Sequence, residues 1–458
     1  MPDALKDYQQ RVIDKLYGKK SPRGVIAYHS TGSGKTYTAL SALSKALQNK
    51  DDRALWIAPA SLTTNFEKER MKHGLQYPGK VDVYSYEKAR NLADKLKDTR
   101  YKLIVLDEAH KLRNSGTSLT SRLKPVLDNS DKVLMLTGTA GYNHPSDMMS
   151  LISLMDSDAK VPRDRKEFIS NYVDEDKWKI KNRPRLKNIL DRYIDVYETP
   201  KDSADFPRIY RKVIDTEMSP HQVELYRYLE NKIPSPLRKK VRNNLPMSLR
   251  EATNLNAFST GIRQASNSIS HHQVNADPFD SEKLRVAADR MARAANKTDN
   301  FRGVAYSNFL DAGILPYEKI LQKHGLKPIV FTGGLDAEQK KKLVADYNTP
   351  GGKKILLLSS SGSEGLDLKG TRLLQILEPH FNRSKIQQVE GRGARYHSHI
   401  DLPEDQRNIT IEEYHSKLPP RMWQKLLNTR DTSIDEYLAA ISNMKQQLTD
   451  DMRGLAKK

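Results

Sequence analysis

The chain contains no cysteine, and none of its apolar runs approaches the length that a membrane-spanning helix needs. The missing cysteines exclude disulfide bonds and thiolate zinc sites. Acidic residues are in deficit, because 57 Asp and Glu against 77 Lys and Arg leave a net charge of +20. This excess favours a polyanionic partner, most simply nucleic acid, although a generally basic surface is the alternative. We expect an intracellular protein without membrane contact, in the reducing cytoplasm of a bacterial or virus-infected cell or in the nucleus.

The 458 residues are enough for two domains with insertions. Short β-branched runs alternate with polar helical stretches, a pattern typical of parallel sheets covered by helices. The expected strands are Val25–Tyr28, Ala54–Ala58, Val81–Tyr84, Leu103–Leu106, Val133–Leu136, Val304–Tyr306, Ile329–Phe331, Ile355–Leu358 and Leu373–Leu377, with Ile409–Tyr414 as a late edge strand. The strand pattern fades between about 141 and 280, which predicts a mainly helical insertion. We expect α/β lobes at 1–160 and 281–415, the insertion at 161–280, and a helical extension at 416–458.

A glycine-rich turn follows the first expected strand, and residues 29–36 read His-Ser-Thr-Gly-Ser-Gly-Lys-Thr. Cradling a triphosphate requires backbone N–H groups on the phosphates, a lysine on the outer ones and a hydroxyl on Mg²⁺. Lys35 and Thr36 supply the last two groups. His29 stands where the first glycine is usual, and a glycine turn that binds no nucleotide is the alternative.

Two adjacent carboxylates, Asp107 and Glu108, close the apolar run Leu103–Leu106. Ligand chemistry in parallel sheets occurs at the carboxyl ends of strands. Asp107 would hold Mg²⁺, and Glu108 would orient and deprotonate the attacking water. A solvated turn is the alternative. Thr137 and Thr139 close the next strand and would either relay between nucleotide and polymer or cap a helix.

A second basic motif lies late in the chain, where Gln388, Arg392 and Arg395 fall at helical spacing and so would share one face. The planar guanidinium of arginine matches phosphate oxygens and stays charged. We expect these residues to complete, from the second lobe, the site that the first lobe begins. A solvated basic helix face is the alternative.

The order of these motifs resembles that of superfamily-two helicases, most closely the Swi/Snf-type ATP-dependent DNA translocases and their short viral and phage relatives. The resemblance is carried in the first lobe by residues 5–9, 57–62, 65–66, 107–114 and 136–139, and on entry to the second lobe by Ser219-Pro220 with Gln222 and Tyr226. In the second lobe it is carried by residues 331–334, 358–360, 364–368 and 432–436. It covers nearly the whole chain. The chain departs from remodelling ATPases at the phosphate loop and at residues 396–399, which follow the arginine motif.

The resemblance implies two RecA-like lobes that use ATP and Mg²⁺. It implies that Gln9 contacts adenine, and that residues 59–61 with the following Phe66 contact the DNA backbone. The nucleotide-binding set would be Gln9, His29, Ser30, Thr31, Gly32, Ser33, Gly34, Lys35, Thr36 and Gly365. The catalytic set would be Lys35, Asp107, Glu108, Gln388, Arg392 and Arg395, with Thr36 and Asp107 on the metal. The nucleic-acid set would be Pro59, Ala60, Ser61, Thr332, Gly333, Ser359 and Ser360.

We therefore expect a DNA-dependent ATPase that translocates on duplex DNA as a monomer. One alternative is a strand-separating helicase, but residues 359–395 contain no Asn-Gly or Asp-Gly hairpin signal. Another is a binding or assembly factor in which hydrolysis only times release.

Overall fold

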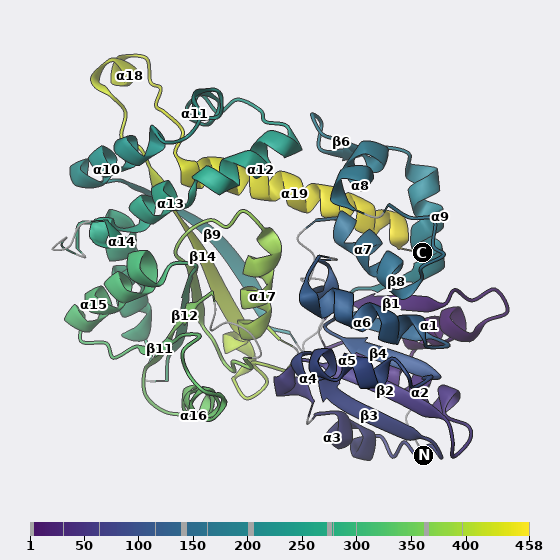
Figure 1. Cartoon of the computed structure of the whole chain (residues 1–458). Coiled ribbons are helices and arrows are strands. Elements are labelled where there is room, and N and C mark those ends of the chain that lie inside the picture. Colours follow the sequence, from purple (N-terminus) through teal and green to yellow (C-terminus); the bar gives the residue numbers. More distant parts are fainter. Residues whose placement is uncertain are drawn as a thin grey trace. The chain divides into compact units, whose positions relative to one another are not determined.

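The computed structural model describes residues 4–30, 32–63, 65–114, 116–138, 144–162, 164–199, 206–272, 277, 279–298, 300–360, 366–395 and 397–457. The chain forms two compact units (Figure 1). Met1–Pro200 and Gln446–Lys458 make the first unit, and Lys201–Lys445 make the second. Among the described residues, no helix is both long and apolar enough to cross a bilayer.

The first unit is built on a six-stranded parallel sheet in the order β3-β2-β4-β5-β1-β8. Its strands are β1 Gly24–His29, β2 Arg53–Ala58, β3 Lys80–Ser85, β4 Leu103–Asp107, β5 Val133–Thr137 and β8 Ile194–Tyr197. A small antiparallel pair joins β6 Val173–Asp174 to β7 Lys179–Ile180. The helices are α1 Asp7–Tyr17, α2 Lys35–Ala46, α3 Asn65–Lys72, α4 Tyr86–Asn91, α5 Ala93–Leu96, α6 Ser118–Asp128, α7 Ser146–Met155, α8 Arg165–Tyr172 and α9 Arg183–Tyr193.

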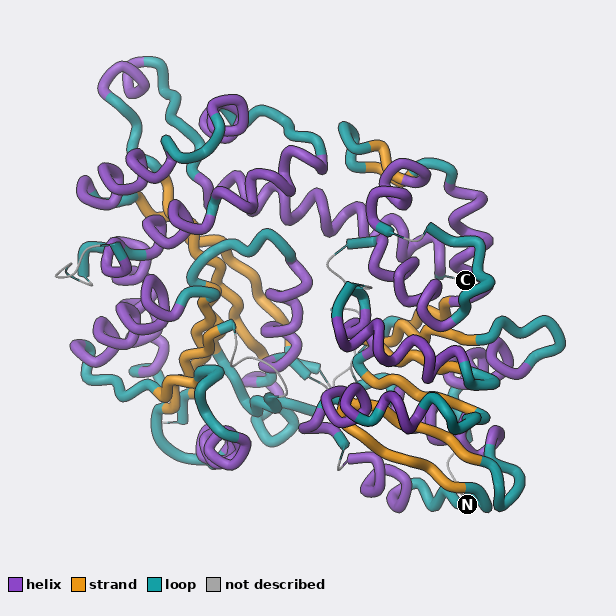
Figure 2. Tube along the Cα trace, in the orientation of Figure 1, coloured by secondary structure: helices purple, strands orange, loops and turns teal. Residues whose placement is uncertain are grey.

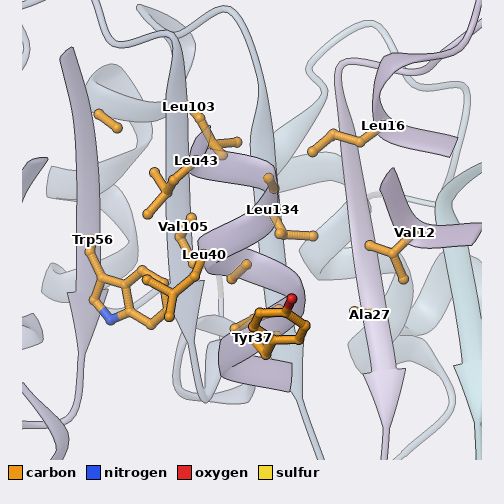
Figure 3. Packing of buried hydrophobic residues seen from close by; sticks show 14 of the residues in the cluster. Val12, Leu16, Ala27, Tyr37, Leu40, Leu43, Trp56, Leu103, Val105 and Leu134 are labelled. Atoms are coloured by element: carbon orange, nitrogen blue, oxygen red, sulfur yellow. The ribbon is translucent and has the colours of Figure 1, made fainter. Parts of the chain in front are cut away.

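One face of this sheet holds the core that positions the phosphate loop. Helix α2 lays Tyr37, Leu40 and Leu43 against strand residues that include Trp56 and Val105 (Figure 3). Nearly all residues of β1, β2, β4 and β5 are buried, because helices cover both faces of the sheet. These strands therefore read as continuous apolar runs, and the five strands predicted for the first lobe are confirmed.

The second unit has its own six-stranded parallel sheet, in the order β11-β12-β10-β13-β14-β9. Figure 2 shows the strands of each unit among the helices that surround them. The strands of the second sheet are β9 Arg208–Glu217, β10 Arg302–Ser307, β11 Ile329–Phe331, β12 Lys354–Ser359, β13 Leu373–Ile376 and β14 Asn408–Lys417. Two apolar clusters lie against the sheet, one with α14 and α15 and one with α16 and α17. The helices are α10 Pro220–Glu230, α11 Ser235–Arg242, α12 Leu249–Phe258, α13 Thr260–Asn267, α14 Glu282–Ala295, α15 Leu315–Lys323, α16 Ala337–Asn348, α17 Arg383–Gly393, α18 Met422–Leu426 and α19 Ile434–Ala456.

The prediction that Ile409–Tyr414 forms an edge strand is wrong. Strand β14 lies between β13 and β9, and β9 is the edge. Strand β9 is mostly exposed and rich in charged residues, so it carries no apolar run that sequence inspection could detect. The two strands pair in parallel over ten residues, which is why β14 is internal.

The predicted division of the chain also differs from the observed one. The segment 161–280 is mainly helical, but it does not form a separate unit, because β8 completes the first sheet and β9 the second. The terminal helix predicted from Ile434 is confirmed as α19. It does not form an extension of its own, since its residues up to Lys445 belong to the second unit and those from Gln446 to the first.

Candidate nucleotide site

The phosphate loop lies between the end of β1 and the start of α2. Gly32 and Gly34 have φ angles of 81° and 77°, a left-handed conformation that favours glycine. A Cβ atom on Gly34 would also approach Gln9 Nε2 to 2.7 Å. Helix α2 begins at Lys35, so its N-terminal N–H groups and the positive end of its dipole meet the loop. This geometry suits an anion such as a triphosphate.

Lys35 lies over the loop that precedes it. Its Nζ donates hydrogen bonds to the carbonyls of His29 (3.0 Å) and Ser30 (3.1 Å). Its charge also acts on Asp107, at the end of β4. The structure therefore brings the predicted phosphate lysine and the predicted metal carboxylate to the same edge of the first sheet.

Burial and the neighbouring Glu108 raise the pKa of Asp107 to about 6, against the opposing effect of Lys35. The Glu108 N–H donates to Asp107 Oδ1 (3.0 Å), and the Tyr86 hydroxyl donates to the Asp107 carbonyl (2.8 Å). Glu108 itself has a left-handed backbone (φ 52°), rare for a residue with a side chain and typical of functional turns. These contacts fix the Asp107 carboxylate and the backbone at the strand end.

A divalent cation fits this arrangement. A buried carboxylate with a raised pKa gains from an adjacent cation, and Mg²⁺ needs only one or two protein ligands beside phosphate oxygens and water. Asp107 and Thr36, at the start of α2, would hold it. Within the described part of the chain, no cluster of three or more His, Asp or Glu side chains forms a metal site on its own.

The amide of Gln9 is directed at the phosphate loop, and its contact with adenine stays a prediction. The side chain is buried, and Nε2 donates to the carbonyls of Ser33 (3.4 Å) and Gly34 (3.3 Å). The hydroxyl of the preceding Tyr8 also donates to the Ser33 carbonyl (2.7 Å). In this structure α1 therefore supports the backbone of the phosphate loop.

The side chain of His29 is fully buried and does not serve as a phosphate ligand here. Its Nε2 lies 2.8 Å from Asp195 Oδ1, and its ring meets the edges of Tyr8 and Tyr197, which stack at 3.5 Å. Arg11 contacts the same carboxylate (3.1 Å). Burial lowers the pKa of His29, whose usual value is 6.5. Sequence inspection missed Asp195 and Tyr197 because they lie on β8, far along the chain.

The predicted arginine motif lies in the second unit. Gln388 and Arg392 are on α17, but this helix ends at Gly393, so the prediction that Arg395 shares their helical face is wrong. Ala394 leaves the helical conformation (φ −126°). Arg395 turns back, with Nε donating to the Gly391 carbonyl (3.1 Å) and Nη1 lying 3.6 Å from Asp367 Oδ1. Gly391 and Gly393 weaken the helix at this point.

The predicted nucleic-acid residues follow strand ends in each unit. Pro59 and Ala60 come directly after β2, and Thr332 and Gly333 directly after β11. Ser359 is the last residue of β12, and Ser360 follows it. The aromatic residue after the first motif, Phe66, is buried against Trp56 and belongs to the core, and its contact with DNA stays a prediction. Thr31, Thr139, Gly365 and the side chain of Ser61 lie outside the described residues.

Basic helix α11 uses part of its charge within the fold. Arg242 pairs with the buried Glu230 (2.6 Å), and Lys240 pairs with Glu251 (2.7 Å). Lys239 is exposed and Arg238 is half-buried, with a hydrogen bond to Asn231. Fewer cations are therefore available to a polyanion here than the sequence indicated.

These features, two parallel-sheet lobes with a phosphate loop and an Asp-Glu strand end in the first, define an ATP-hydrolysing enzyme of the helicase class. Family models agree: "DEAD/DEAH box helicase" matches residues 6–98, "SNF2-related domain" residues 68–272 and "Helicase conserved C-terminal domain" residues 278–397. The chain belongs to the Swi/Snf-type superfamily-two helicases, whose two lobes are RecA-like.

Individual relatives include viral proteins. The chain is 30% identical over 449 residues to a putative ATP-dependent RNA helicase of Acanthamoeba polyphaga mimivirus, covering 97% of this chain and 94% of that protein. It is 24% identical to a termination factor NPH-I homolog of African swine fever virus, covering 99% of this chain and 79% of the relative. A solved Sulfolobus solfataricus SWI2/SNF2 ATPase core in complex with dsDNA shares 17% identity at a TM-score of 0.40, covering 99% of this chain and 97% of that one.

Proposed function

We propose that this enzyme couples ATP hydrolysis to translocation along double-stranded DNA, as a monomer. The proposal that the enzyme hydrolyses ATP rests on one observation: Lys35, at the phosphate loop, lies close enough to Asp107 at the end of β4 for its charge to act on that carboxylate, and Glu108 follows Asp107 directly. The family and the net charge of +20 support the proposal that the enzyme acts on DNA. The first unit would form the first lobe, and β9 to β14 with their helices the second.

Each residue of the site has a proposed role. Lys35 holds the outer phosphates, and the N–H groups of the loop bind the others. Asp107 and Thr36 hold Mg²⁺, which supplies positive charge to the phosphates when it binds with ATP. Glu108 orients the attacking water and accepts its proton. Gln388, Arg392 and Arg395 of the second unit stabilise the charge that develops on the transferred phosphate.

The polymer is the part of the proposal most in need of a test, since one relative is named a putative RNA helicase and another a termination factor. A duplex translocase pulls along one strand and pushes off whatever blocks it. We expect ATP-driven displacement of the third strand of a DNA triplex, with little unwinding of a forked duplex. The matched control is Glu108→Gln, which retains ATP binding but should displace nothing.

Strand separation is the second candidate, and helix α18 favours it. The short helix and its end expose Met422, Trp423, Leu426 and Leu427, with 86% of Met422 and 85% of Leu426 accessible. Apolar side chains of this kind can enter between base pairs as a wedge. Fork unwinding that falls in Trp423→Ala while its ATPase rate is kept would support this candidate. Efficient fork unwinding without triplex displacement would overturn duplex translocation.

A further inference from the structure

The first residue of the phosphate loop is tied to a residue far along the chain. The Ser30 and Thr199 hydroxyl oxygens lie 2.7 Å apart, and the Thr199 N–H donates to Ser30 Oγ (2.9 Å). The Ser30 N–H donates to the carbonyl of Tyr197, the last residue of β8 (2.9 Å). Both Ser30 and Thr199 are partly buried. Three hydrogen bonds therefore fix the start of the loop to the end of β8.

Thr199 holds a particular place in the chain. Strand β8 ends at Tyr197, the first unit ends at Pro200, and the next described strand, β9, belongs to the second unit. Thr199 is therefore the last described residue before the chain passes from the first unit to the second. Any displacement of Ser30 would therefore act directly on Thr199, where the chain begins to pass to the second unit.

The residue before Thr199, Glu198, is bound to α19, the helix in which the chain passes between the two units a second time. The Glu198 carboxylate pairs with Arg453 (2.7 Å) and Lys457 (2.6 Å) at the end of α19. Arg453 also acts on the hydroxyl of Tyr28, a buried residue of β1 two positions before Ser30. Helix α19 enters the first unit from the second at Gln446. The chain thus passes between the two units twice, after Thr199 and within α19. The consecutive residues Glu198 and Thr199 hold these two passages beside β1 and the phosphate loop.

We propose that Thr199 is a positioning residue that links the phosphate loop to both passages between the units, with Glu198 as its second anchor. This inference rests on the proposed function, because the coupling matters only if nucleic acid stimulates hydrolysis. Nucleotide contacts at the loop move Ser30, and the hydrogen bonds between Ser30 and Thr199, here called the clasp, pass this movement to Thr199. ATP binding itself does not need the clasp. The nucleic-acid-stimulated rate depends on it.

The test compares Thr199→Val, which keeps the shape and the backbone N–H but lacks the hydroxyl, with Thr199→Ser, which keeps the hydroxyl. We expect basal ATPase rate and KM for ATP within about two-fold of wild type in both variants. The DNA-stimulated kcat should fall about three- to ten-fold in Thr199→Val, the effect of one neutral hydrogen bond. Thr199→Ser should retain stimulation. Thr117→Val, which removes the hydroxyl that caps α6, controls for local stability loss.

Glu198→Gln gives an independent measurement, because it weakens the pairs with Arg453 and Lys457 but leaves Ser30 untouched. It should also lower the stimulated kcat at unchanged KM, and the combined Glu198→Gln/Thr199→Val effect should be less than the product of the two. Wild-type stimulation in Thr199→Val, or equal impairment in Thr199→Ser, Thr117→Val and Thr199→Val, would overturn the inference. Absence of stimulation in the wild type would instead overturn the proposed function.

Discussion

The two units share a plan but place their buried charges differently. In the first unit, the buried His29 and Asp195 and the half-buried Asp107 gather around the phosphate loop. In the second, buried or partly buried ion pairs join elements of the fold: Lys283–Asp435 joins α14 to α19, and Arg290–Glu412 and Arg383–Glu413 join α14 and α17 to β14. Asp435 also accepts a hydrogen bond from the N–H of Ser416 on β14 (2.9 Å). Charge in the first sheet thus surrounds a binding site, whereas charge in the second mainly holds structure.

The largest expected effect on ATP hydrolysis comes from replacing Lys35 in the first unit. Lys35→Ala should abolish ATP hydrolysis because the outer phosphates lose their cation, while the fold survives. A steady-state ATPase assay and circular dichroism measure the two results. Activity near the wild-type rate in a folded Lys35→Ala protein would refute the nucleotide site.

Arg395 tests whether the second unit also contributes chemistry. Arg395→Ala should bind ATP normally and hydrolyse it about 10³-fold more slowly, the effect typical of an arginine that stabilises transferred phosphate. Single-turnover hydrolysis separates this step from binding. Asp367→Ala, which removes the carboxylate 3.6 Å from Arg395, is the matched control and should change the rate far less. A loss of only a few-fold in Arg395→Ala would mean that this residue does not complete the site.

The buried pair in the second unit should matter for stability and not for ATP affinity. Lys283 and Asp435 are 0% and 1% exposed and lie 2.8 Å apart. Lys283→Met leaves a buried carboxylate without its cation, which should cost about 3–5 kcal/mol of unfolding free energy in urea denaturation. Removing both charges, in Lys283→Met/Asp435→Leu, should cost less. Equal losses in the single and double variants would show that packing and not charge is responsible.

The smallest expected effect concerns pH in the first unit. Burial lowers the pKa of His29, so the folded state binds fewer protons than the unfolded state below pH 6.5. Folding stability should therefore fall as the pH drops from about 7 through the unfolded value of 6.5. Burial alone would raise the pKa of Asp195, but hydrogen bonds from His29 and Arg11 outweigh it and lower that pKa, which adds a further loss at still lower pH.

His29→Gln should flatten this dependence between pH 7 and 5.5, because it removes the titrating ring and keeps a polar group near Asp195. The difference between wild type and variant isolates His29 from the other histidines. An identical pH slope in both proteins would show that protonation of His29 does not limit stability.

Most of the first sheet could be predicted because its strands are buried on both faces and read as apolar runs. The partners that complete it could not. Asp195 reads as an ordinary acidic residue, and only the pairing of β8 with β1 brings it to His29. In the second unit, helical spacing suggested a face that includes Arg395, but two glycines end the helix before it. Local pattern thus identified strands and motifs, whereas long-range pairing decided what each side chain contacts.

The most direct test of the central claim is the ATPase rate with single-stranded DNA, duplex DNA and RNA of increasing length, side by side. A translocase gains from a longer track, because each binding event then supports more cycles of hydrolysis before the end is reached. We expect stimulation by duplex DNA that grows with its length, and weaker stimulation by single strands and RNA. Equal stimulation by short and long duplexes would contradict translocation and favour a factor in which hydrolysis only times release.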